Sequence, residues 1–246
     1  MRHKKFTLIL LLLLTTILVI GCSPKATDNS ADKEAIVALE DKVAEQLTQI
    51  ESLELDKTAG ELENTTLKLQ IESLTSTVAA STTLIGAALE VAQSLADQDM
   101  AVFSSYVHAT QGVRFTPYGY VNPAVDLSYP STAFATLLTD PTTFTWGAFD
   151  GSGDPIIYTF ADYFDNFIYD EDYVNPDMIG LNTTIGTGNS LINLSTIYPT
   201  ASFVEFHFTG FDPQYGGIDW TSLILVFENV AGDWKLVGVV HNQWTI

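Results

Sequence analysis

Three side chains in the C-terminal third of the chain have the residue types that acid–base chemistry requires. In the segment SFVEFHF, alternation places Glu205 and His207 on one face of a strand. In KLVGVVHNQ, His241 shares a face with Val237 and Val239. If these strands are neighbours, the three polar side chains line a common cavity, where a histidine and a carboxylate can exchange protons with a substrate. Buried, hydrogen-bonded structural histidines are the alternative.

The segment FDGSGDPI contains two closely spaced carboxylates. Asp150, Ser152 and Asp154 match the first three oxygen ligands of an EF-hand-type calcium loop. Pro155 and Ala161 occupy the positions that need glycine and glutamate. We therefore favour a tight turn, with a nonstandard calcium site or a pair of catalytic carboxylates as alternatives, and we expect no other cofactor.

A second group of residues has the properties of ligand contacts. The loop GFDPQYGGIDW carries Tyr215, Asp219 and Trp220, and with Trp146 and Trp244 its aromatic side chains can stack on a sugar or another flat ligand. Asp219 is also an alternative to Glu205 as the acid–base partner of His207. Arg114 can grip a carboxylate of an acidic ligand with two hydrogen bonds. The alternatives are aromatic core residues at strand ends and a structural ion pair of Arg114.

The charge of the chain restricts its partners. Its formal net charge is −20, and from residue 81 onward two basic residues stand against eighteen acidic ones. Such a surface repels phosphate backbones, so we expect no nucleic-acid partner. The sequence contains neither a G-x-S-x-G nor an H-E-x-x-H motif.

The first 22 residues indicate export. Basic residues precede an unbroken apolar run that ends in VIGC, the order found in secretion signals. VIGC resembles the lipobox of bacterial lipoproteins, and Cys22 is the only cysteine. The resemblance implies a signal peptide at 1–21 and acylation of Cys22, for example by palmitate, which holds the protein on the extracytoplasmic face of a membrane. An uncleaved signal anchor is the alternative.

A flexible linker at 22–31 leads into a heptad repeat that predicts a coiled-coil stalk at 32–80. The apolar a positions are all β-branched and the apolar d positions are all leucine, as in parallel two-stranded coiled coils. The a positions are Ile36, Val43, Ile50, Ile71 and Val78, and the d positions are Leu39, Leu53, Leu67 and Leu74. Gln46, Lys57, Gly60 and Asn64 interrupt this seam. The stalk thus predicts a parallel homo-oligomer, and the alternative is an amphipathic helix folded onto the head.

The head, residues 81–246, predicts an α+β domain. Helical spacing is present at 84–107, 131–140 and 160–169, and strand patterns at 144–149, 202–208, 221–230 and 233–244. A turn signal in ENVAGDW joins the last two strands as an antiparallel hairpin. We expect a curved antiparallel sheet with helices on one face, preceded by the coiled-coil helix.

Two segments of the head, DMAVFSSYVHATQGVRFTPYGY and LVFENVAGDWKLVGVVHNQW, resemble the nuclear transport factor 2-like superfamily. Others, including GVRFTPY, DGSGDPI and FDPQYGGIDW, resemble bacterial lipoprotein domains of no assigned function. The first resemblance implies a cone-shaped α+β fold with a pocket at its open end. We expect a membrane-anchored lipoprotein whose head binds a small ligand or a partner. The alternatives are an acid–base enzyme of isomerase, dehydratase or hydrolase type, and a non-catalytic assembly module.

Overall fold

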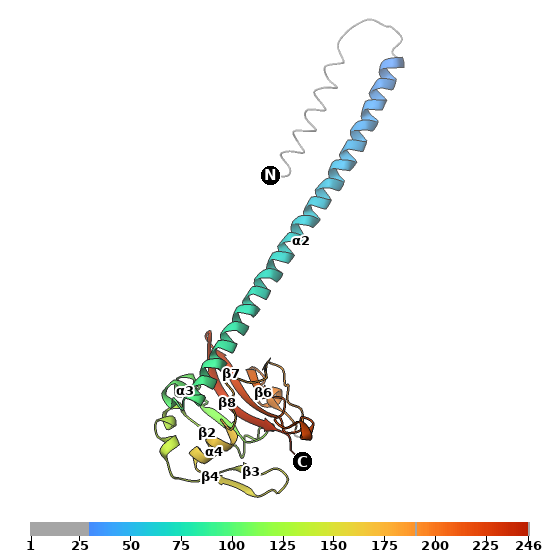
Figure 1. Ribbon diagram of the computed structural model, residues 1–246. Coiled ribbons are helices and arrows are strands. Elements are labelled where there is room, and N and C mark those ends of the chain that lie inside the picture. The colour runs from blue at the N-terminus through green and yellow to red at the C-terminus, as the bar shows by residue number, and fades with distance from the viewer. Residues whose placement is uncertain (1–29, 190, 246) are drawn as a thin grey trace. The chain divides into compact units, whose positions relative to one another are not determined.

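The computed structural model describes residues 30–189 and 191–245, so the predictions for the signal peptide, Cys22 and most of the linker lie outside the described residues. The chain divides into two compact units, one ending at Gln70 and the other beginning at Ile71. The head elements and their order are drawn in Figure 1.

A single long helix, α2 (Ser30–Ala96), covers the whole predicted stalk. It passes without a break through residue 80, where we placed the boundary between stalk and head, and through Gly60. The long N-terminal helix is therefore confirmed. Its association with a second copy stays a prediction, as does the boundary.

The last third of α2 belongs to the core of the head. Leu84, Ala88, Val91 and Leu95 recur at helical spacing and are fully buried. Among the residues that the structure describes, α2 is the one helix with the length and composition to cross a membrane, which is a weak indication of membrane association. Signal sequences and core helices of soluble proteins meet the same criteria, and this buried stripe is typical of a core helix.

The predicted helix at 84–107 is divided in two by the sequence ADQD. The chain turns at Gln98, which has a positive φ of 52°. Asp99 then begins α3 (Met100–Tyr106), because its side chain accepts hydrogen bonds from the backbone amides of Ala101 and Val102.

The head contains a six-stranded sheet in the order β2-β1-β8-β7-β6-β5. Its strands are β1 (Val113–Thr116), β2 (Ser128–Tyr129), β5 (Met178–Leu181), β6 (Ser202–Phe208), β7 (Thr221–Val230) and β8 (Asp233–Gln243). The predicted hairpin is confirmed, because β7 pairs antiparallel with β8 along its whole length. The prediction of a purely antiparallel sheet is wrong, since β1 runs parallel to β8. The class is α+β with a mixed sheet.

Apolar side chains cover both faces of the sheet. The first face carries Leu223, Leu225 and Phe227 of β7 and packs against the helices in the main core. The second face carries Ile224 and Val226 and forms a smaller cluster with the short helix α5 (Leu194–Ile197). Helices therefore lie on both faces, and the prediction of helices on one face alone is wrong. The small cluster also contains Val121, Leu194, Val237 and Val240.

The first face is closed by an aromatic layer. It contains α4 (Phe160–Phe167), which is confirmed as a helix, and a separate hairpin of β3 (Phe144–Ala148) and β4 (Pro155–Tyr158). The predicted helix at 131–140 is two short 3-10 turns instead, η1 (Ser131–Ala135) and η2 (Leu137–Thr139). A third, η3 (Pro213–Tyr215), lies in the loop before β7. One buried apolar side chain on each of the first two turns, Phe134 on η1 and Leu137 on η2, is not enough to extend a regular helix.

Candidate functional site

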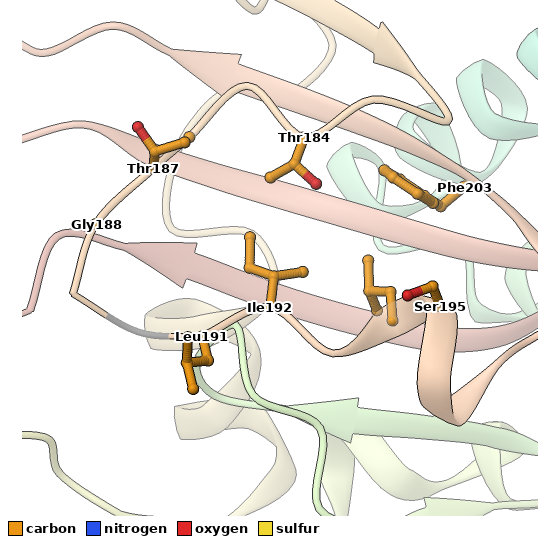
Figure 2. A pocket seen from close by; sticks show the side chains of 9 residues that line it. Thr184, Thr187, Gly188, Leu191, Ile192, Ser195 and Phe203 are labelled. Atoms are coloured by element: carbon orange, nitrogen blue, oxygen red, sulfur yellow. The ribbon is translucent and has the colours of Figure 1, made fainter.

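A pocket of about 360 Å³ lies between β6 and the segment that leads from β5 to α5. Its lining residues are Thr184, Gly186, Thr187, Gly188, Leu191, Ile192, Leu194, Ser195 and Phe203. Figure 2 shows the hydroxyl groups of Thr184 and Ser195 turned toward the middle of the pocket, while that of Thr187 points away. The lining combines an apolar wall with hydroxyl groups and contains no charged side chain.

One wall of the pocket, formed by residues 184–188, is held by a carboxylate on the sheet. Glu205 is fully buried in the centre of β6. Its Oε2 accepts a hydrogen bond of 2.7 Å from the backbone amide of Ile185, and its Oε1 accepts one of 2.9 Å from Gly186. The hydroxyl of Ser222 donates a third bond of 2.7 Å to Oε1. A buried carboxylate needs such partners, and here they also fix the backbone at residues 185 and 186.

The two glycines of the segment IGTGNS allow this wall to approach the sheet. A Cβ atom on Gly186 would lie 2.4 Å from the ring of Trp220, and one on Gly188 would lie 3.2 Å from it. Trp220 itself is almost completely buried. Any larger residue at 186 would push the segment away from Glu205, so glycine is needed here for close packing.

His207 extends the polar cluster behind the pocket. Its Nδ1 lies 2.7 Å from the hydroxyl oxygen of Ser222. Because the Ser222 hydrogen is donated to Glu205, His207 must donate its own Nδ1 hydrogen to Ser222. Burial lowers the pKa of His207 below its usual 6.5, against the opposing effects of the Glu205 and Asp177 charges.

This direction of donation has a chemical consequence. A histidine that activates a serine nucleophile must accept the hydroxyl proton, whereas His207 donates to Ser222. Ser222 is also fully buried. The cluster of Glu205, Ser222 and His207 is therefore suited to holding the pocket wall rather than to nucleophilic catalysis.

His241 lies on the opposite face of the sheet, and the prediction of a cavity shared with Glu205 and His207 is wrong. Paired residues of neighbouring strands share a face. His241 pairs with Leu223, whereas His207 pairs with Ser222, the next residue on β7. Successive residues of a strand point to opposite faces, which separates the two histidines.

On its own face, His241 belongs to a second polar cluster. Its Nδ1 lies 3.1 Å from the carbonyl oxygen of Pro117, so this nitrogen carries a hydrogen. Its Nε2 lies 3.1 Å from both Asp170 Oδ2 and Thr221 Oγ1. Tyr173 joins the cluster through a hydrogen bond of 3.0 Å to Asp170. These contacts connect the end of α4 to the sheet.

Arg114 has a structural role in the described part of the head. Its guanidinium donates to the backbone carbonyl oxygens of Asp126 (3.0 Å) and Pro123 (3.4 Å). These bonds hold the turn between β1 and β2. They are hydrogen bonds to backbone carbonyl groups, whereas the structural alternative in the sequence analysis was an ion pair with a carboxylate.

The aromatic ligand candidates occupy different environments. Trp146 is fully buried in the aromatic layer, where no ligand reaches it without unfolding. Tyr215 is 52 % exposed on η3. Asp219 organises the same loop, because its Oδ2 accepts hydrogen bonds from the backbone amides of Phe211 and Asp212, and these bonds lower its pKa. None of these three residues lines the pocket.

The segment FDGSGDPI forms the turn between β3 and β4, as we favoured. The amide of Phe149 donates to the carbonyl of Asp154 (2.8 Å), and the amide of Gly153 donates back to Phe149 (2.9 Å). Gly151 and Gly153 have positive φ angles of 83° and 73°. Among the described residues, no group of three or more histidine, cysteine or acidic side chains is placed to hold a metal ion.

No family model, curated protein or solved structure matches this chain. The pocket must therefore be interpreted from its own residues. None of the eight ligand candidates lines it, although Glu205 and Trp220 pack behind its wall. The sequence signal that points to it is the pair of glycines in IGTGNS.

Proposed function

We propose that the chain is an extracytoplasmic lipoprotein, anchored through acylated Cys22, whose head binds a small uncharged ligand in the pocket beside β6. One observation carries the ligand-binding part: the pocket wall is fixed in advance by two backbone hydrogen bonds to buried Glu205, whose carboxylate a third bond from Ser222 holds in place. A wall that is already ordered binds without the entropic cost of ordering it.

The chemistry of the lining defines the class of ligand. Leu191, Ile192, Leu194 and Phe203 favour an apolar or flat surface, and the inward hydroxyls of Thr184 and Ser195 favour hydrogen-bonding groups on it. A charged ligand would lose its hydration without gaining a counter-charge. The excess of acidic residues in the head further disfavours anions. A neutral molecule with one apolar face, such as an aryl glycoside, satisfies these conditions.

A matched pair of probes tests this proposal. In an NMR titration of the amide signals, phenyl glucoside is expected to shift the signals of residues 184–195, and phenyl glucuronide, its charged counterpart, to bind at least about tenfold more weakly. Ser195→Trp fills the pocket and is expected to abolish the shifts. Thr196→Trp, at the neighbouring exposed position outside the lining, serves as the control. Shifts that survive Ser195→Trp would place the binding site elsewhere.

The lipoprotein part rests on VIGC and on Cys22 as the only cysteine. Cys22→Ala is expected to leave a longer, unprocessed precursor that incorporates no labelled palmitate, because both cleavage and acylation require the thiol. Ser23→Ala keeps the cysteine and should be processed normally. Cleavage and acylation of the two variants can be followed by gel mobility and label incorporation in the native host. Release of the unmodified wild-type protein into the medium would contradict the proposal.

The acid–base enzyme has weaker support than the binding protein. Both oxygens of Glu205 are occupied, and His207 and His241 lie on opposite faces. The relationship to the nuclear transport factor 2-like superfamily also stays a prediction. It is supported by the α+β class and by the sheet with packed helices.

A further inference from the structure

The apolar seam of α2 is uncovered along most of its length in the single chain. Its residues Ile36, Leu39, Ile50, Leu53, Leu67, Ile71, Leu74 and Val78 are between 42 % and 66 % exposed. Burying such side chains stabilises a structure by about 1.5–3 kcal/mol each. An isolated helix gains little from its own hydrogen bonds in water, so a seam of this length requires a partner.

We propose that this seam pairs with the seam of a second copy to form a parallel, in-register, two-stranded coiled coil. The seam is complementary to itself, because β-branched residues occupy the apolar a positions and leucine the apolar d positions. In a parallel pair, each residue faces its own counterpart. This arrangement packs β-branched layers and leucine layers separately, which favours two strands over three or four.

Asn64 specifies the register of the pair. It occupies an a position, where a parallel in-register dimer brings two asparagine side chains together and each amide can bond the other. In an antiparallel dimer an a position faces a d position, so Asn64 would face a leucine, Gly60 or, in one register, Gln46. The cost of burying an unpaired amide therefore opposes shifted pairings and those antiparallel pairings that place Asn64 against leucine or Gly60. The antiparallel register that places Asn64 against Gln46 is distinguished by the cross-linking test.

Charged residues beside the seam favour the same orientation. Glu63 is at a g position and Lys68 at the following e position of the heptad. In a parallel dimer a g residue lies beside the e residue five positions later in the partner, so Glu63 and Lys68 form two ion pairs across the interface. Asp56 and Glu61 repel each other in the same geometry, but Lys57 lies 3.9 Å from Glu61 on its own helix and offsets this charge.

Cysteine cross-linking in the full-length protein tests orientation and register together. Ile36→Cys and Val78→Cys lie at opposite ends of the seam, and each can form a disulfide with its own counterpart only in a parallel, in-register pair. After oxidation in membranes, we expect at least about tenfold more linked dimer from these variants than from Asp41→Cys and Ser76→Cys. The two controls occupy f positions, which face away from the partner. The wild-type chain measures any background link through Cys22.

Each remaining outcome would overturn the proposal. Links that form only when Ile36→Cys and Leu74→Cys chains are mixed, one at an a and the other at a d position, indicate an antiparallel pair. Equal yields from seam and control positions indicate random collision. Sedimentation of the detergent-solubilised wild type at three or four chain masses, after correction for bound detergent, excludes a two-stranded assembly. Sedimentation at a single chain mass shows that the seam is covered by something other than a second copy.

Discussion

Glu205→Gln is expected to lower the free energy of unfolding of the head by about 3 kcal/mol. The glutamine amide has one oxygen and one NH2 group, so one of the two acceptor positions becomes a donor. If the NH2 takes the Oε2 position, it faces the amide hydrogen of Ile185. If it takes the Oε1 position, it faces that of Gly186. Either orientation leaves a buried donor without an acceptor.

Two measurements check this result. Urea unfolding followed by tryptophan fluorescence gives the stability, and hydrogen exchange gives the protection of the Ile185 and Gly186 amides, which should fall more than that of β7. Glu171→Gln is the matched control. Glu171 is only half-buried, so the substitution should change stability by less than about 0.5 kcal/mol. Unchanged exchange at residues 185 and 186 in Glu205→Gln would show that the carboxylate does not hold the pocket wall.

Local sequence patterns predict the parts of the fold that local physics determines. The alternation in SFVEFHF places Glu205 and His207 on one face, and the register of β6 confirms it. The turn between β7 and β8 follows from VAGD, where Ala231 and Gly232 have positive φ angles of 54° and 103°. The stripe of buried side chains in the last third of α2 follows from its spacing.

The errors arise where distant segments meet. The pairing of β1 with β8 joins residues more than 120 positions apart, and no local pattern sets their relative direction. In β8, the pairing with β7 skips Val237, whose side chain joins the cluster on the second face. This irregularity separates Val237 from Val239 and His241, although simple alternation places all three together.

The pocket is the feature that the sequence predicts least. The wall formed by residues 184–188 is an irregular segment whose position depends on buried contacts with Glu205 and Trp220. Neither contact produces a periodic pattern in the sequence. A pair of glycines is equally consistent with a turn and with a site where the backbone closely approaches a neighbouring side chain. The contact between the Trp220 ring and Gly186 in the structure decides for close approach over a simple turn.

Trp146→Ala is expected to destabilise the head by about 4 kcal/mol. The indole is fully buried and stacks on Tyr163 with ring centres 3.9 Å apart and planes within 13°. The ring centres of Trp146 and Phe115 lie 6.2 Å apart with nearly perpendicular planes, and Trp146 Nε1 donates a hydrogen bond of 3.1 Å to the carbonyl of Tyr158. Removing it leaves a cavity in the aromatic layer, because the closely packed rings around it relax only partially into the space.

Two further variants separate packing from the ligand role that the sequence suggested for Trp146. Trp146→Phe keeps an aromatic ring but loses the donor to Tyr158, so a smaller loss of about 2 kcal/mol is expected. Trp244→Ala removes an exposed indole outside the core and should cost less than about 1 kcal/mol. Urea unfolding of all three variants gives the ranking. Because Trp146 lies away from the pocket lining, Trp146→Phe should bind phenyl glucoside as the wild type does. Weaker binding by this variant, while it remains folded, would restore Trp146 as a ligand contact.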